Sequence, residues 1–272
     1  MTMRRLLRRF TKHAQRILSD RSIEDSSDLA SLRQKALLFL YVKSTKTAAS
    51  IRLLLLKRRW EDAMILLRSL LENLICYQWL RMKGDPAIVR FARFECVTKL
   101  REHKKSREAT IFKRNAEEFD YLAAQANIEQ ELMNWNDQLK TLEPAFDLKT
   151  QEDLDNRGLW GGRNIRQMAE EIDRTNSLKD LTWIYDIPFG LGNEFVHPNP
   201  ATVRSYLKTS NRLFIPVFKT THEWQYEIQV LTCQTLLEMM RLADGDFHLG
   251  KSELDQQLSR DFESLLRKKD NE

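Results

Sequence analysis

The chain has 272 residues, of which 42% are hydrophobic and 31% charged, a composition that fits an ordinary soluble globular protein. With only 8 Gly and 6 Pro, it favours helix and disfavours a turn-rich β fold. No run approaches the ~18 uninterrupted apolar residues of a membrane span, because Arg68 and Glu72 interrupt the best candidate. Integral membrane association is therefore not expected.

The basic character of the chain is concentrated at its N-terminus. The formal net charge is +5, but residues 1–18 hold six basic side chains and no acid, so the rest of the chain sums to −1. Apolar residues recur among them at helical spacing, which predicts a basic amphipathic helix followed by a polar linker, together residues 1–27. Three roles remain open for this arm: docking on its own domain or a partner's, contacting nucleic-acid phosphates, or lying on an anionic membrane surface. The basic residues are Arg4, Arg5, Arg8, Arg9, Lys12 and Arg16.

A helical hairpin is predicted next, built around one unusually apolar helix. Its first helix begins near residue 28 and continues to residue 56, and the second contains residues 63–80. The second carries only two charges, Arg68 and Glu72, which lie four residues apart and so share one face. Gly84, followed by Asp-Pro, is expected to end this helix.

The remainder of the chain also reads mainly as helix. A helix should end at His197, because the following Pro198 forces the preceding backbone into an extended conformation. Residues 143–163 are the least regular part and predict a loop. The predicted fold is thus a single all-α domain over residues 28–272, a multi-helix bundle built on the central apolar helix. The further helices are expected over residues 86–142, 164–174, 202–214, 221–242 and 252–267.

The sequence predicts neither a metal site nor a cofactor. No Ser-His-Asp elbow, Cys-His signature or Walker loop is present. The cysteines lack metal-ligand spacing and are expected to be reduced, buried thiols of a cytoplasmic protein: Cys76, Cys96 and Cys233. The five histidines lie far apart, without ligand spacing on a helix: His13, His103, His197, His222 and His248.

Several features follow one another in a recognisable order. A Leu-rich helix holds Arg68-Ser69-Leu70-Leu71-Glu72, a Trp-Gly-Gly-Arg loop precedes a short helix, and a late Val-His-Pro segment contains His197. In this order the chain resembles domain-of-unknown-function family 5677 over about residues 30–245. The resemblance implies an all-helical fold and singles out Arg68, Glu72 and His197 as a candidate catalytic set. The same features supply candidate substrate-binding residues, namely Trp160, Arg163, Tyr185 and Asn193.

The residue types of this set suit phosphate chemistry. An arginine holds a phosphate or stabilises developing charge, and a histidine exchanges protons near neutral pH as a general acid or base. A structural alternative is equally concrete: Glu72 pairs with Arg68, and His197 hydrogen-bonds to Glu72 to hold a loop against the bundle. HEPN-type helical ribonucleases offer an analogy, since they use an Arg and a His a few residues apart on one helix. Here Asn193 stands where that arginine is wanted, so Arg68 would have to replace it through space.

Two functional hypotheses follow. The first is a metal-independent, ribonuclease-like enzyme, acting as a toxin or an anti-phage defence effector, that cleaves RNA at the Arg68, Glu72 and His197 set. The alternative is a non-catalytic interaction module whose basic arm binds RNA, another nucleic acid or a partner protein. Self-association into a homo-oligomer also remains open.

Overall fold

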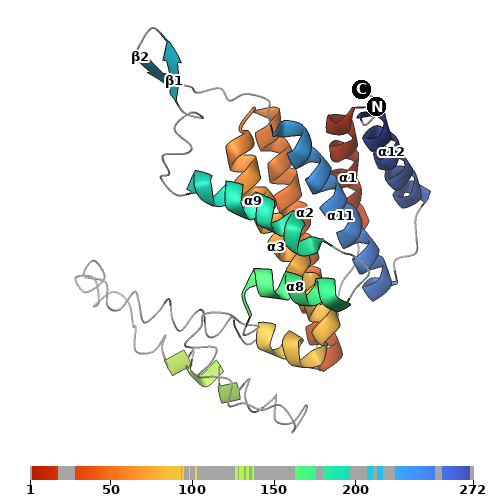
Figure 1. Cartoon of the computed structure of the whole chain (residues 1–272). Coiled ribbons are helices and arrows are strands. Elements are labelled where there is room, and N and C mark those ends of the chain that lie inside the picture. Colours follow the sequence, from red (N-terminus) through yellow and green to blue (C-terminus); the bar gives the residue numbers. More distant parts are fainter. Residues whose placement is uncertain are drawn as a thin grey trace. The chain divides into compact units, whose positions relative to one another are not determined.

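A computed structural model shows a protein made almost entirely of helices in the parts that it describes (Figure 1). The described residues are 2–17, 28–92, 163–175, 180–196, 207–210, 213–216, 224–248 and 253–269, with scattered helical positions between 94 and 137. The long helices are α1 (Met3–Ile17), α2 (Leu29–Leu56), α3 (Trp60–Lys83), α8 (Ile165–Thr175), α9 (Leu181–Val196), α11 (Gln225–Phe247) and α12 (Glu253–Lys269). The predicted all-α fold class is therefore confirmed. None of the helices in these ranges reaches the length and hydropathy of a membrane-spanning segment.

The chain divides into two compact units. The first unit contains Met1–Ser22, Leu37–Trp79 and Ile165–Glu272, and the second contains Ile23–Ala36 and Leu80–Asn164. Helices α2 and α3 each run from one unit into the other, so the single domain expected from residue 28 onward stays a prediction.

Helix α1 lies in the first unit, packed against α11 and α12 (Figure 1). Its apolar residues follow helical spacing, and the side of the helix that they form is buried. The ring of Phe10 meets that of Phe262 on α12 edge to face, with centroids 6.2 Å apart. The hydroxyl of Tyr41 on α2 donates to the carbonyl of Ala14 at 3.0 Å, which fixes the other end of α1. The buried residues of α1 are Met3, Leu6, Leu7, Phe10, Thr11 and Ala14.

The connection between α2 and α3 is only three residues long, which makes the two helices a hairpin as predicted. Burial then varies along α3. Residues 73–80 are all buried, so this part of the helix is covered on every side. Closer to the N-terminus one half-exposed stripe remains, with the spacing i, i+3, i+4 and i+7 of a single helix face. It consists of Ile65, Arg68, Ser69 and Glu72.

Helix α3 ends where the sequence predicts. Gly84 follows its last residue with φ +70°, a left-handed conformation that glycine adopts without steric cost. The Gly84 N–H donates to the carbonyl of Leu80 at 2.9 Å, which satisfies one of the last carbonyls of the helix.

One prediction is wrong: residues 207–214 are not helical. Strands β1 (Leu207–Ser210) and β2 (Leu213–Pro216) form a two-stranded antiparallel hairpin in which Leu207 pairs with Pro216 and Ser210 with Leu213 (Figure 1). A two-residue connection that begins with Asn211 favours a tight turn, and the flanking Thr, Phe and Ile favour strand. This turn signal outweighs the apolar spacing from which the helix was predicted.

Candidate functional site

The candidate site lies where α3 and α9 meet in the first unit. On α3, the Nε of Arg68 donates to Oε1 of Glu72 at 2.9 Å. The side chains are 27% and 29% exposed, so the ion pair stands at the solvent boundary and not in the closed core. A pair with this exposure contributes at most about 1 kcal/mol to stability. Its geometry therefore leaves both groups accessible for a role other than holding the fold together.

Tyr185 on α9 completes the contact from the other side. Its hydroxyl donates to the same Oε1 of Glu72 at 3.4 Å, across 113 residues of sequence. Burial raises the pKa of Tyr185 above its usual value, and the negative charge of Glu72 raises it further, while Arg68 opposes the shift. Tyr185 therefore stays protonated at neutral pH and acts as a hydrogen-bond donor to the carboxylate.

Phe189, one turn further along α9, holds the guanidinium of Arg68. The Cζ of Arg68 lies 4.1 Å from the centroid of the Phe189 ring, within the range of a cation–π contact. The same ring lies 5.1 Å from that of Tyr185. Sequence reasoning missed Phe189, although its position four residues after Tyr185 places both aromatic rings on one face of α9.

The structure thus brings together three of the predicted site residues, Arg68, Glu72 and Tyr185. Arg163 is exposed and belongs to the second unit. Asn193 lies in α9, but its side chain is not described. Trp160 and His197 lie outside the described residues. Their predicted roles stay predictions.

Helix α9, which carries Tyr185 and Phe189, ends at Val196, as the His-Pro sequence predicts.

Helix α8 fixes the start of α9. The carboxylate of Asp173 accepts hydrogen bonds from the backbone N–H groups of Leu181 at 3.0 Å and Thr182 at 2.8 Å. It also accepts one from the Thr182 hydroxyl at 2.6 Å. A carboxylate at a helix N-terminus accepts hydrogen bonds from N–H groups that have no partner within the helix, and its negative charge is stabilised by the positive end of the helix dipole. Sequence reasoning missed this cap, because its donor groups and its acceptor belong to different helices.

We expect Asp173→Ala to lower the free energy of unfolding by about 1–3 kcal/mol, because three donors lose their acceptor. Glu170→Ala is the matched control, since Glu170 is a carboxylate of α8 whose ion pair with Arg166 is exposed. Urea denaturation of both variants checks the expectation. Equal losses in the two variants would show that Asp173 does not hold α9.

The two cysteines that the structure describes are buried, in agreement with the sequence prediction. Burial raises the pKa of Cys76 to about 12, and the negative charge of Glu72 adds to the shift against the opposing charge of Lys43. Burial also raises the pKa of Cys233. Both thiols are therefore neutral at physiological pH and are poor nucleophiles. Cys96 lies outside the described residues.

Within the described ranges, no group of three or more His, Cys, Asp or Glu side chains is arranged to hold a metal ion. The absence of a metal and of a cofactor stays a prediction for the chain as a whole.

The sequence pattern of a protein family matches residues 34–214, more than half of the chain, and its description is "Family of unknown function (DUF5677)". The chain belongs to DUF5677. The family predicted from the order of features is thus confirmed, and its matched segment contains Arg68, Glu72 and Tyr185. Helices α1, α11 and α12 lie outside this segment. No curated protein and no solved structure matches the chain significantly.

Proposed function

We propose that the protein binds RNA through the outward face of α1. The observation that carries this proposal is the way in which α1 docks. Its apolar side is buried against α11 and α12, so its opposite side is turned to solvent in a defined orientation. Five exposed basic residues, here called the basic face, occupy that side: Arg4, Arg5, Arg8, Lys12 and Arg16.

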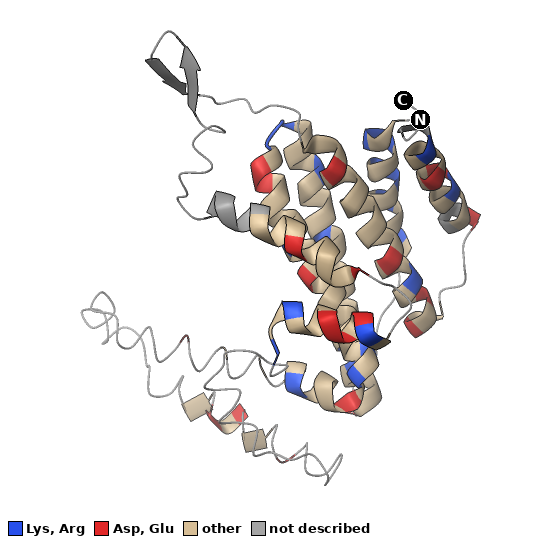
Figure 2. Cartoon of the chain, viewed as in Figure 1, with Lys and Arg blue, Asp and Glu red and all other residues tan. Residues whose placement is uncertain are grey.

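The basic face has the charge pattern of a phosphate-contacting surface. At 100° per residue its members fall within an arc of about 120°, and they extend over about 18 Å of helix. No acidic residue occurs in α1, and Figure 2 shows Lys and Arg along it. Arg9, at the edge of this face, pairs with Asp261 on α12 and so fixes the docking of the helix. Contacts of this kind read the nucleic-acid backbone and not its bases.

The proposal is tested by replacing the basic face with glutamine. Glutamine keeps the helix propensity but removes the charge. We expect affinity for a single-stranded RNA of about 20 nucleotides to fall by about two to three orders of magnitude near 0.1 M salt. A matched control removes five exposed basic residues elsewhere, so that the net charge of the two variants is equal: Lys43, Lys46, Lys57, Arg59 and Arg267. If the control loses as much affinity as the basic-face variant, binding follows net charge and the proposal fails.

Deletion of residues 1–18 is the less informative test. Because Leu6 and Phe10 have no exposed surface, removal of α1 would uncover the apolar sides of α11 and α12. A loss of RNA binding after the deletion would then have two possible causes, the missing basic residues or unfolding of the protein. Charge replacement leaves the buried side of α1 intact.

A second candidate function is cleavage of the bound RNA at the site on α3 and α9. The specific observation in its favour is the fixed guanidinium of Arg68, which Glu72 holds by its Nε and the Phe189 ring by its face. A pre-oriented arginine at the solvent boundary suits stabilisation of a phosphodiester transition state. In this proposal His197 acts as the general acid or base and Arg68 stabilises the developing charge. The proposed cellular setting is a toxin or an anti-phage defence effector, for which growth arrest on expression is the readout.

A further inference from the structure

We propose that a pocket among α3, α9 and α11 binds a small neutral molecule that carries one O–H or N–H donor on an apolar body. The pocket has a volume of about 170 Å³. Apolar cavities of about 150 Å³ hold molecules of the size of benzene. The inference does not rest on RNA binding or on cleavage, because none of the described residues of those proposals lines the pocket.

The apolar part of the pocket lining consists of Ile184 and five leucine side chains from three helices. Leu71 and Leu74 come from α3, Leu181 from α9, and Leu231 and Leu237 from α11. All five belong to the first unit. Such walls favour an apolar body, and they offer few hydrogen-bond partners to water molecules.

Gln78 contributes a buried amide oxygen to the pocket, and the leucine side chains cannot donate a hydrogen bond to it. It is 5% exposed and lines the pocket, and its Oε1 accepts no hydrogen bond from the described residues. A buried amide oxygen without a donor is unfavourable and calls for a partner. The neighbouring hydroxyl of Thr235 already donates to the carbonyl of Leu231 at 2.7 Å. A ligand with a donor group would pair with the Gln78 oxygen while its apolar body fills the leucine walls.

The charges of the pocket lie toward its exposed side. Gln234 and Arg241 are exposed, and Glu238 faces Arg241 at 3.7 Å. The two opposite charges offset each other, and the other described lining residues are neutral: the Gln78 and Gln234 amides, the Thr235 hydroxyl and aliphatic side chains. A charged ligand would lose its hydration there without a compensating partner, so the ligand class is neutral.

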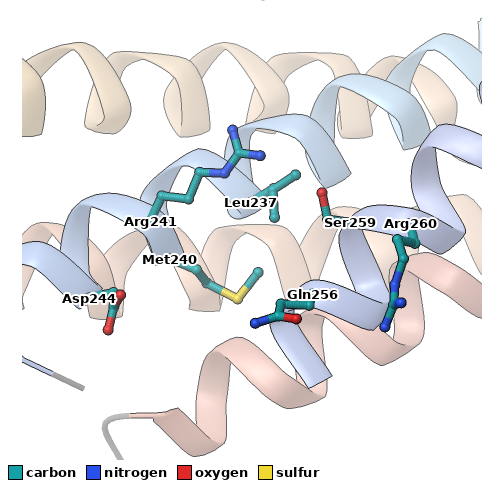
Figure 3. A pocket seen from close by; sticks show the side chains of 7 residues that line it. All are labelled: Leu237, Met240, Arg241, Asp244, Gln256, Ser259 and Arg260. Atoms are coloured by element: carbon teal, nitrogen blue, oxygen red, sulfur yellow. The ribbon is translucent and has the colours of Figure 1, made fainter. Parts of the chain in front are cut away.

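A larger pocket of about 580 Å³ lies between α11 and α12 (Figure 3). It shares Leu237 and Arg241 with the pocket of about 170 Å³. Its two arginines, Arg241 and Arg260, point to opposite sides, so they do not converge on one anion (Figure 3). Both are exposed to solvent. The smaller pocket is therefore the better candidate, because among the described lining residues of the two pockets only Gln78 has a buried polar atom without a hydrogen-bond partner.

The test compares phenol with toluene, which have similar size but differ in the hydroxyl donor. Both are titrated into the full-length protein and followed by NMR or calorimetry. A purely apolar cavity prefers toluene, because phenol loses more hydration on entry. We expect phenol to bind about tenfold more tightly than toluene, through the hydrogen bond to Gln78.

Three variants complete the test. Gln78→Leu should remove the preference for phenol while toluene still binds, and Gln78→Met repeats the test if the first variant does not fold. Gln234→Leu, at the exposed side, should keep the preference. Ile184→Trp should lower the affinity for both molecules at least about tenfold by filling the pocket. A protein that shows no saturable binding holds only water there, and this result overturns the proposal. A preference for phenol that survives in Gln78→Leu and Gln78→Met overturns it as well.

Discussion

Replacement of Phe10 by alanine is expected to lower the free energy of unfolding by about 3–5 kcal/mol, one of the largest effects of a single change in this protein. Phe10 has no exposed surface, and its ring meets Phe262 of α12 edge to face. Alanine would remove the apolar area that docks α1, leave a cavity, and abolish the aromatic contact. Urea unfolding of the purified variant measures the loss.

Gln15→Ala is the matched control for this prediction. Gln15 is exposed on the same helix, and alanine has the higher helix propensity, so its stability should change by less than about 0.5 kcal/mol. A loss below about 1 kcal/mol for Phe10→Ala would mean that α1 is not docked through its apolar side. The orientation of the basic face would then have no structural basis.

His197→Ala is expected to lower the rate of RNA cleavage by about 10²–10⁴-fold, the usual contribution of a general acid or base. Arg68→Lys should lower it by about 10²–10³-fold, because lysine keeps the charge but loses the planar group held by Glu72 and Phe189. Glu72→Gln, which weakens the hold on Arg68, should lower it by about 10²-fold. None of the Arg68 or Glu72 variants should lose more than about 1 kcal/mol of stability, since this ion pair is at the solvent boundary.

Arg166→Lys is the matched control for Arg68→Lys. Arg166 also pairs with a glutamate four residues later, Glu170 on α8, and its second partner is Asp186 on α9, which is not one of the proposed site residues. Its cleavage rate should equal that of the wild type. If the wild-type protein binds RNA without cleaving it, the chain is an interaction module, and the second candidate function is wrong. If the Arg68 and Glu72 variants unfold instead, the pair is a structural strut.

Much of the fold was predictable because it depends on local signals. Helical spacing of apolar residues located α1 and the hairpin of α2 and α3. Gly84 marked the end of α3, and the His-Pro sequence marked the end of α9. The hairpin of β1 and β2 was missed because its apolar residues also fit a helix, and only the two-residue turn decides between the two.

The candidate site was only partly predictable, because its contacts join distant parts of the chain. Arg68 and Glu72 share a face of one helix, and their pairing followed from a spacing of four residues. The contact between Tyr185 and Glu72 spans 113 residues, and no periodicity encodes it. The same holds for the cap that Asp173 provides and for the ring of Phe189 against Arg68. The docking of α1 on α11 and α12 likewise joins opposite ends of the chain.

The most direct test of the basic face is the salt dependence of RNA binding. If all five residues contact phosphates of a single strand, the slope of log Kobs against log salt concentration should be about −3.5 for the wild type. The glutamine variant of the basic face should give a slope near zero, and the control with five other basic residues replaced should keep the wild-type slope. Equal slopes for the wild type and the basic-face variant would contradict the role of α1 in RNA binding.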